Sequence, residues 1–234
     1  MKISIITPTL NHALFIEDTI LSVLNQDHKE FEHIIIDGGS IDGTIDILKK
    51  YPHLKWISEK DSGQSQAINK GFRIATGDII GWINSDDFYE KNIFSTIANF
   101  FELNEDCSVL YGNQTDIDEN KNVIGIRAGE VFTLVKLLKN PDIVRQPVCF
   151  WRKSILKDVG HLNEKYHLAM DYDFFLRIAK KYKFCYVNKD FCFFRLFPGT
   201  KTSRFSKRQR QEIYAIMKDE RGGIFRFYIF ILRS

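Results

Sequence analysis

The stretch ATGDIIGWINSDDFYE, residues 75–90, joins a short apolar run to a pair of adjacent carboxylates. Its alternating β-branched and bulky apolar residues predict a buried strand, which leads directly into Asn84, Ser85, Asp86 and Asp87. Like charges buried side by side cost free energy unless a cation, a ligand or solvent compensates them. The stretch is therefore either a polar turn that is acidic by chance or a binding site.

The sequence before this stretch repeats the order strand, loop, helix. KISIITPT predicts a strand followed by a helix, FEHIIIDGGSIDGT a strand followed by a glycine-rich loop and a helix that opens at Thr44, and LKWISEK a weaker strand followed by the helix QAINKGFRIAT. This repeat predicts an α/β fold with a Rossmann-like, mostly parallel central sheet, right-handed crossovers and flanking helices.

Four polar loops follow the carboxyl ends of these strands. They cover residues 7–11, 37–40, 61–64 and 84–87. Ligands of open α/β sheets bind outside the carboxyl ends of the strands, so the four loops are expected to line one crevice. Four polar loops in the same position make a site the better interpretation of residues 84–87.

The bulk composition excludes several classes of protein. A net charge of +3, with no basic run interleaved with stacking aromatics, gives no support for nucleic-acid binding. The four cysteines form no CxxC pair and predict buried, reduced thiols, which fits a cytoplasmic location. The N-terminus has no signal-peptide pattern, and no window reaches the length of a membrane span.

Three motifs carry candidate chemistry. In DGGSIDGT the glycines allow backbone amides to approach a ligand and Asp37 offers an acceptor, although a helix-capping turn explains the isolated motif equally well. The oxygen ligands of NSDD suit Mg²⁺ or Mn²⁺. In MDYDFF, Asp171 and Asp173 are either helix-capping residues or, for one of them, a general base. Neither GxGxxG nor a P-loop is present.

Taken together, these segments resemble the family 2 glycosyltransferases, the inverting GT-A enzymes that use nucleotide-sugar donors. The resemblance runs from residue 3 to about residue 203. Its matches follow one another in order: ITPTLN, DGGSIDGT, EKDSGQSQAINKGFRIATGDIIGWINSDD, QPVCFWRKSIL, AMDYDFFLRIAKK and FRLFPGTKTS. It implies a GT-A domain over residues 1–203, with a nucleotide-binding half (1–89) and an acceptor-binding half (90–203), followed by a basic and aromatic tail (204–234).

The resemblance also implies roles for individual residues. Asp171 matches the catalytic base, Asp61 a contact to a pyrimidine that is usually uracil, and Asp86 with Asp87 the end of a motif that binds Mg²⁺ or Mn²⁺. The nucleotide-sugar site is expected to comprise Pro8, Thr9, Asn11, Asp37, Gly39, Ser40, Asp61, Gln64, Lys70, Asn84, Ser85, Asp86 and Arg195.

Four positions depart from the family pattern. Asn84 replaces the first Asp of the metal motif, and Gly38 replaces the second acid of a DD turn. Met170 stands where many members have a Glu before the catalytic Asp, and Phe197 stands where many have a His. The changes at 84 and 197 remove potential contacts to the metal or the diphosphate. We therefore expect Asp86 to be the main protein ligand of the metal.

The expected function is inverting transfer of a sugar, from a nucleoside-diphosphate sugar that is UDP-linked, to a hydroxyl of a glycan or lipid-linked acceptor in cell-envelope polysaccharide synthesis. One alternative is a nucleotidyltransferase acting on sugar phosphates, which should carry a basic loop after the first strand, whereas TPTLNHALF has no Lys or Arg. The other is a non-catalytic sugar-nucleotide-binding module, which has no need of both Asp86 and Asp171.

The C-terminal tail pairs a basic stretch, KTSRFSKRQR, with an aromatic one, GGIFRFYIFILRS. This pairing is typical of segments that lie on anionic membranes, and it fits equally well a helix and strand packed on the domain. In the first case the contact would be peripheral, at the inner face of the cell membrane.

Overall fold

A computed structural model describes the backbone of residues 1–197 and 206–231, and the side chains of residues 1–197 and 207–219. Within this part of the chain nine strands form one sheet: β1 Ile3–Thr9, β2 Phe31–Asp37, β3 Leu54–Ser58, β4 Ile79–Trp82, β5 Phe88–Tyr89, β6 Cys107–Ile117, β7 Val123–Arg127, β8 Cys149–Arg152 and β9 Lys183–Arg195. The helices are α1 Ile16–Leu24, α2 Thr44–Leu48, α3 Gln64–Ile74, α4 Phe94–Leu103, α5 Leu134–Lys139, α6 Leu156–Val159, α7 Met170–Ala179 and α9 Ser206–Ile231, with 3-10 turns at Pro141–Ile143, Gln146–Val148 and Lys153–Ile155.

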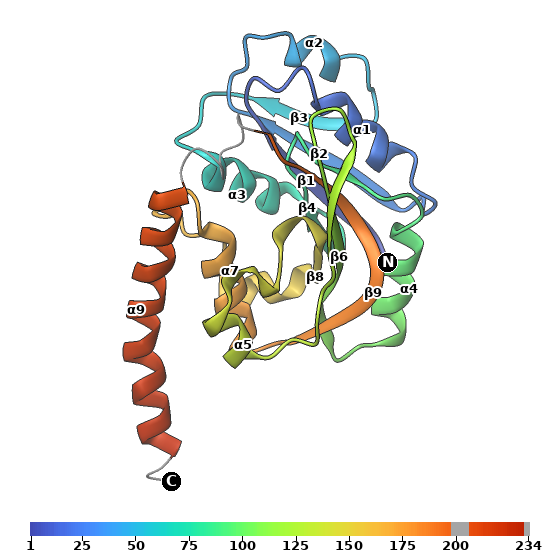
Figure 1. Ribbon diagram of the computed structural model, residues 1–234. Coiled ribbons are helices and arrows are strands. Elements are labelled where there is room, and N and C mark those ends of the chain that lie inside the picture. Colours follow the sequence, from blue (N-terminus) through green and yellow to red (C-terminus); the bar gives the residue numbers. More distant parts are fainter. Residues whose placement is uncertain (198–205, 232–234) are drawn as a thin grey trace.

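The sheet has the strand order β3-β2-β1-β4-β8-β6-β9-β5, with β7 paired to β6 outside this path. Strands β1 to β4 are parallel to one another, and β6 is parallel to β9. β8 enters antiparallel between β4 and β6. Helices flank the sheet (Figure 1), so the predicted α/β class with a mostly parallel, GT-A-like sheet is confirmed.

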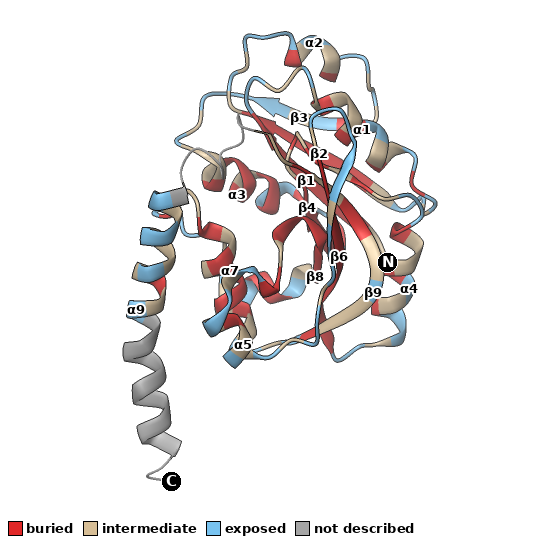
Figure 2. Ribbon diagram, in the orientation of Figure 1, coloured by how far each residue is buried: buried red, intermediate tan, exposed pale blue. Residues whose placement is uncertain are grey.

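The central strands are buried on both faces, as Figure 2 shows. All seven residues of β1 are buried, which explains its continuous apolar run in the sequence. Helix α3 lies close against β1 because Gly71 faces it; a Cβ atom at position 71 would stand 2.5 Å from Ile6. The close approach holds the later turns of α3 against the middle of β1.

The aromatic residues form the core of the second half. Trp151 on β8 contacts Phe174 edge to face, with ring centroids 5.4 Å apart, and Phe174 stacks on Phe72 of α3 at 6.0 Å. Edge-to-face and offset pairs of this kind stabilise beyond the area that they bury. Helix α7 is thereby held against both β8 and the first half of the molecule.

The cysteine prediction is partly wrong. Cys149 and Cys192 are buried free thiols, but Cys107 on β6 and Cys185 on β9 form a disulfide. The two strands are parallel neighbours, and their register pairs Leu110 with Cys185. Sequence spacing gave no sign of this pair because the two cysteines are 78 residues apart.

Helix α9 begins beside α7 and then extends away from the body of the molecule (Figure 1). On its first turns Ile216 is buried, and Ile213 and Met217 pack against the core. Contacts thus cross the boundary expected at residue 203. Residues 198–203, which the resemblance includes in the domain, lie outside the described residues. Among the described residues, no helix is both long and apolar enough to span a membrane.

Candidate active site

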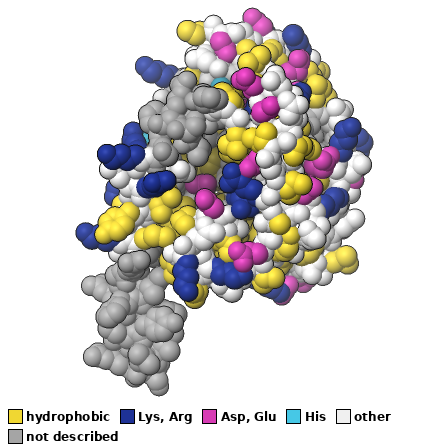
Figure 3. All heavy atoms as spheres, viewed as in Figure 1, with side chains coloured by type: hydrophobic (Ala, Val, Ile, Leu, Met, Phe, Trp, Pro, Cys, Tyr) yellow, Lys and Arg dark blue, Asp and Glu magenta, His cyan; other side chains and the backbone are white. Residues whose placement is uncertain are grey.

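A cleft of about 560 Å³ opens at the carboxyl ends of β1 and β4, and its hollow is visible on the face in Figure 3. Its walls come from both halves of the chain. The sequence-predicted residues that line it are Pro8, Thr9, Asp61, Gln64, Asn84, Ser85, Asp86, Asp171 and Arg195. The other predicted residues, Asn11, Asp37, Gly39, Ser40, Lys70 and Asp87, are not among the lining residues.

Asp86 and Asp87 lie in different environments. Asp86 lines the cleft, whereas Asp87 is buried and is not among the lining residues. One carboxylate oxygen of Asp87 accepts a 2.9 Å hydrogen bond from the backbone N–H of Arg195, and the other a 3.5 Å bond from Asn84. The structure therefore does not bring Asp87 to the place where both were expected to hold a metal.

Burial governs the acidity of both groups. It raises the pKa of Asp86, against the opposing charges of His12 and Arg195. Burial, and then the neighbouring Asp86 charge, raises the pKa of Asp87 well above its ordinary value. The pKa of each acid is thus raised because its charged form loses solvation, and for Asp87 also because of the adjacent charge.

Asn84 makes contacts that an aspartate could not make. Its Oδ1 accepts hydrogen bonds from Gln64 at 2.8 Å and from the Trp82 indole at 3.1 Å. Its Nδ2 donates to Asp87 and to Gln146, each at 3.5 Å. A carboxylate has no donor for these two acceptors, so the departure from the family pattern has a local reason.

The glycine-rich loop after β2 is organised around Asp37. The buried Asp37 carboxylate accepts hydrogen bonds from the amides of Gly39 and Ser40, at 2.9 and 3.0 Å, and from Ser58 at 2.6 Å. Gly39 has a φ of +90°, which favours glycine. The carboxylate shapes the loop from within instead of pointing into the cleft.

The loops after β1 and β2 are tied together. The Asn11 amide donates to the Ser40 hydroxyl at 2.7 Å, and the Asn11 side chain accepts from the Ile41 amide at 2.9 Å. Asn11 has a φ of 53°, in the left-handed region that asparagine tolerates. These residues support the wall formed by Pro8 and Thr9.

Asp61 lines the cleft above Gly38. Its Oδ1 accepts from the Gly63 amide at 2.9 Å, and its Oδ2 lies 3.0 Å from the position that a Cβ atom on Gly38 would occupy. A second acid at position 38 would therefore crowd Asp61. Lys70 lies on α3 outside the cleft and forms a 2.7 Å ion pair with Glu59.

Asp171 lies in the first turn of α7 and lines the cleft. The N-cap residue Ala169 has no side chain that could satisfy the free amides of this turn. In the segment just before the helix, Oε2 of Glu212 on α9 accepts from the amides of His167, Leu168 and Ala169, at 3.0, 2.8 and 3.1 Å. Sequence reasoning missed Glu212 because it is 41 residues beyond Asp171 in a segment assigned to the tail.

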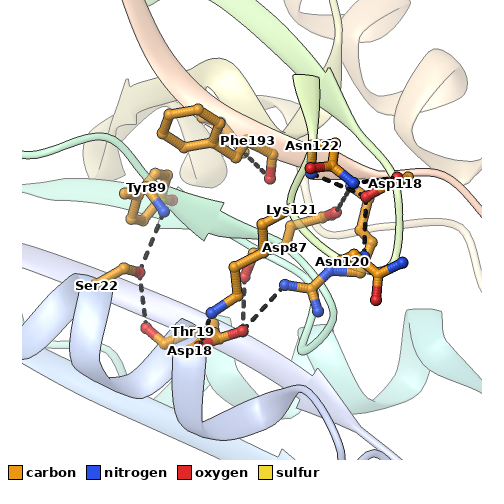
Figure 4. Close-up of polar contacts among 12 residues, drawn as sticks. Asp18, Thr19, Ser22, Asp87, Tyr89, Asp118, Asn120, Lys121, Asn122 and Phe193 are labelled. Carbon is orange, nitrogen blue, oxygen red and sulfur yellow. Dashed lines mark hydrogen bonds and ion pairs between the residues drawn. The ribbon is translucent and has the colours of Figure 1, made fainter. Parts of the chain in front are cut away.

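Arg195 is almost fully buried at the end of β9. Its guanidinium forms a 3.0 Å ion pair with Asp18 of α1 and stacks over Phe15, 4.4 Å from the ring centroid. Figure 4 shows that Asp18 also binds Lys121, from the turn between β6 and β7, at 2.7 Å. The charge of Arg195 is therefore already paired inside the protein.

Several residues that the sequence did not single out also line the cleft. His12 follows the predicted Asn11, and its Nδ1 lies 2.7 Å from the Ser85 hydroxyl. Arg127, Arg145 and Gln146 come from the second half. Proximity to the predicted first loop was a signal for His12, whereas the arginines follow no recognised motif.

Known proteins share this arrangement. The family model described as glycosyl transferase family 2 matches residues 4–160. A protein of Mycobacterium bovis described as a PGL/p-HBAD biosynthesis glycosyltransferase is 32% identical over 180 residues, 74% of this chain and 68% of the relative. Chondroitin synthase of Escherichia coli is 29% identical over 205 residues, 86% of this chain but only 30% of the relative.

Solved structures show the same fold. S. aureus TarS 1-349 in complex with UDP-GlcNAc has a TM-score of 0.72 at 23% identity, over 87% of this chain and 61% of that one. The mannosyltransferase PcManGT from Pyrobaculum calidifontis, in complex with GDP-Man and Mn²⁺, has a TM-score of 0.65 at 18% identity, over 94% and 63%. With the family match over most of the sheet and the cleft, these findings lead to one conclusion: the chain is a glycosyltransferase and belongs to glycosyl transferase family 2.

Proposed function

We propose that this enzyme transfers a sugar from a UDP-linked donor to a hydroxyl of a glycan or lipid-linked acceptor, with inversion at the anomeric carbon, in cell-envelope polysaccharide synthesis. The observation that carries the proposal is the shared cleft, which is lined by Asp61 and Asp86 from the first half and by Asp171 from the second. The cleft therefore offers lining residues from the first half to a nucleotide and from the second half to a second substrate. The UDP-GlcNAc bound to TarS supports a UDP donor, and the relatives named for PGL/p-HBAD and chondroitin support a glycan product.

In the proposed reaction Asp171 is the general base. An acceptor hydroxyl attacks the anomeric carbon, its proton passes to the Asp171 carboxylate, and the bond from the anomeric carbon to the diphosphate oxygen breaks. A carboxylate, with an ordinary pKa of about 3.9, cannot remove an alcohol proton in advance, so proton transfer accompanies attack. One base and no covalent intermediate give inversion.

The residues present fit a divalent cation that the donor helps to hold. Mg²⁺ is commonly bound by one or two carboxylates together with substrate phosphates, and Asp86 offers one carboxylate to the cleft. No three His, Cys, Asp or Glu side chains in the described residues are placed to hold an ion by themselves. When bound, Mg²⁺ or Mn²⁺ would stabilise the charge of the departing diphosphate.

The two alternatives have less support. A nucleotidyltransferase needs cationic groups for a triphosphate, yet the residues of the first loop that line the cleft are Pro8, Thr9, Leu10 and His12. A non-catalytic binding module has no need for a carboxylate at Asp171. Both alternatives also conflict with membership of a glycosyltransferase family.

We further propose peripheral contact with an anionic membrane through α9. Lys207, Arg208, Arg210 and Lys218 are exposed on its described part. The aromatic residues that follow in the sequence supply apolar groups for the interface.

A donor screen tests the function. The purified protein is incubated with UDP-, GDP- and dTDP-linked hexoses and Mn²⁺, and the released nucleoside diphosphate is measured. We expect UDP-linked donors to be hydrolysed fastest. A preference for GDP-linked donors would contradict the assignment of uracil as the nucleobase of the donor. Failure to bind or hydrolyse any donor would contradict the proposed function.

The assignment of Asp171 as the general base has its own test. Asp171→Asn is expected to lower transfer by at least about 100-fold, because general-base catalysis is worth that much, while UDP affinity stays within twofold. Isothermal titration with UDP provides the second measurement. Near-wild-type turnover in the purified variant would show that Asp171 is not the base.

A further inference from the structure

Three arginines line the cleft, and they differ in their partners. Arg127 forms an ion pair with Asp116 at 2.5 Å, and Arg195 one with Asp18 at 3.0 Å. Within the described part of the chain, Arg145 has no carboxylate at ion-pair distance. Arg145 is thus the cleft arginine whose charge the described protein groups leave unpaired.

The environment of Arg145 makes an unpaired charge costly. The side chain is half-buried, and its Nε is fully buried without a hydrogen-bond partner. Its Nη1 makes one long contact, 3.4 Å to the Arg127 carbonyl. Burial, and then the charge of Arg127, lowers the pKa of Arg145, against the weaker opposing influence of Asp142 and Asp116. A desolvated guanidinium beside a second one is stabilised when an anion binds.

The nearby acids do not fill this role. Asp116 is already engaged by Arg127 and by Gln114, the latter at 2.6 Å. Asp142 is exposed and remains beyond ion-pair distance of Arg145 among the described contacts. An entering carboxylate or phosphate can therefore bind Arg145 without displacing an existing ion pair.

Arg145 shares the cleft with the candidate base, Asp171. Its carbonyl accepts a 3.0 Å hydrogen bond from the buried thiol of Cys149, whose pKa is raised by burial and then by the charge of Asp171. The adjacent Gln146 contacts Asn84, next to the cleft-lining turn. Arg145 therefore belongs to the part of the cleft where the second half of the chain meets the reacting groups.

We propose that Arg145, assisted by Arg127, forms a subsite for an anionic group of the acceptor, either the carboxylate of an acidic sugar or a phosphate. The planar guanidinium fork matches both groups. Arg145 is assigned to the acceptor because it lines the cleft from the second half of the chain, as the candidate base Asp171 does, whereas Asp61 and Asp86 come from the first half. The proposal rests on the proposed function for the identity of the second substrate.

Calorimetric titration of three probes, with and without UDP, tests the subsite. The probes are methyl β-D-glucuronide, methyl β-D-glucoside 6-phosphate and the neutral methyl β-D-glucoside. At least one anionic probe is expected to bind about tenfold tighter than the neutral one, an affinity difference that one good charge-assisted contact supplies. The two anionic probes distinguish a carboxylate subsite from a phosphate subsite.

Substitutions identify the residue responsible. Arg145→Gln should abolish the preference for the anionic probe, Arg145→Lys should retain part of it, and the exposed Arg127→Gln should weaken it. Lys136→Gln is the matched control, because it removes a charge from the same half outside the cleft-lining set. Melting temperatures establish that the variants are folded. If Arg145→Gln does not fold, Arg127→Gln still tests the subsite.

Three outcomes would overturn the proposal: equal affinity for neutral and anionic probes, no measurable binding of any probe, or an unchanged preference in Arg145→Gln. A fall of tenfold or more in UDP affinity in Arg145→Gln, with the probes unaffected, would instead make Arg145 a donor ligand. Failure of the proposed function is distinguishable, because it would appear as a lack of donor binding and hydrolysis whatever the probes do.

Discussion

At the scale of single residues, Asp86 and Asp87 follow one another in sequence but differ in their access to the cleft. Asp86 lines the cleft, and Asp87 accepts a hydrogen bond from the Arg195 amide inside the protein. The Thr19 hydroxyl also donates to the Asp87 carbonyl, at 2.6 Å (Figure 4). One acid is thus available to a ligand while its neighbour joins α1, the turn and β9.

This division predicts unequal effects of two matched substitutions. Asp86→Asn should lower kcat/KM for Mn²⁺-supported donor hydrolysis by about 100-fold, since it removes the cleft carboxylate that would hold the cation. Asp87→Asn keeps an oxygen that can accept from the Arg195 amide, so it should cost less than tenfold in the same assay. Equal losses in the two variants would contradict the division of roles.

A second residue-scale prediction concerns Glu32, a buried acid on β2 outside the cleft. Burial alone would raise its pKa, but the Lys55 ammonium at 2.6 Å and hydrogen bonds from Ser4 and Thr76 outweigh burial and hold the pKa far below its ordinary range. A carboxyl group whose pKa is depressed by folding contributes stability above its unfolded pKa, near 4.5. That contribution is lost as the pH falls below this value.

Glu32→Gln should therefore lower the free energy of unfolding by about 2 kcal/mol at pH 7, the scale of hydrogen bonds to a charged group. The difference from wild type should shrink as the pH is lowered from 5 to 3.5. Urea unfolding across this range measures it. A difference that stays constant with pH would show that the Glu32 charge is not responsible.

The sequence indicated which residues lie in the 84–87 turn but not which of them face the cleft. The direction of each side chain depends on partners far along the chain, such as Arg195 for Asp87. The same holds for Asp37, whose motif was recognised although its carboxylate turns toward Ser58. Motif spacing carries no information about such long-range partners.

At the scale of elements, the contact between α7 and α9 changes the boundary of the catalytic body. The amides of residues 167–169, which lead into α7, donate to Glu212 of α9, and Gln209 donates to the Leu168 carbonyl at 3.3 Å. Both Leu168 and Gln209 line the cleft. We propose that the first turns of α9 belong to the catalytic body, and that Glu212 positions the segment before Asp171.

Glu212→Ala is expected to lower kcat by about tenfold while the donor KM stays within twofold, because it leaves three amides next to the base without their acceptor. Glu212→Gln should recover most of the activity, since an amide oxygen can accept the same bonds. Asp219→Ala, at an exposed position of the same helix, is the matched control. A lower melting temperature with unchanged kcat in Glu212→Ala would show that Glu212 stabilises the fold and does not position the base.

Element types were largely predictable because strand, loop and helix alternate with clear periodicity up to Tyr89. In the second half, β8 runs antiparallel between β4 and β6, although its residues are separated from β4 by helices and turns. Periodicity predicts that such a strand exists but not where it inserts. The cleft-lining arginines of that half were missed for the same reason.

At the scale of the whole molecule, α9 is the feature that departs from a compact outline (Figure 1). Its first turns are anchored through Ile216, and Tyr214 on the same turns is 68% exposed. An anchored helix with exposed basic groups can bring the cleft close to an anionic surface without crossing it.

Two deletions test this arrangement. Removing residues 222–234 should leave donor hydrolysis unchanged and lower cosedimentation with phosphatidylglycerol vesicles at least fivefold, with phosphatidylcholine vesicles as the control. Removing residues 206–234 should also lower kcat by at least about tenfold, because Glu212 is lost together with the core contacts of Ile216. Unchanged vesicle binding after the shorter deletion would show that residues 222–234 do not contribute to membrane binding.

The strand order has a consequence for synthesis on the ribosome. Strands β1 to β4 can pair as soon as residue 82 has emerged, but the other edge of β4 is covered only when β8, beginning at Cys149, arrives. At about 5–20 residues per second this edge stays open for several seconds, long enough to pair with another nascent chain. Gly81 leaves room on the face of the sheet for the Phe150 ring, which a Cβ atom would meet at 2.7 Å, so that β8 can pair closely with β4 when it arrives.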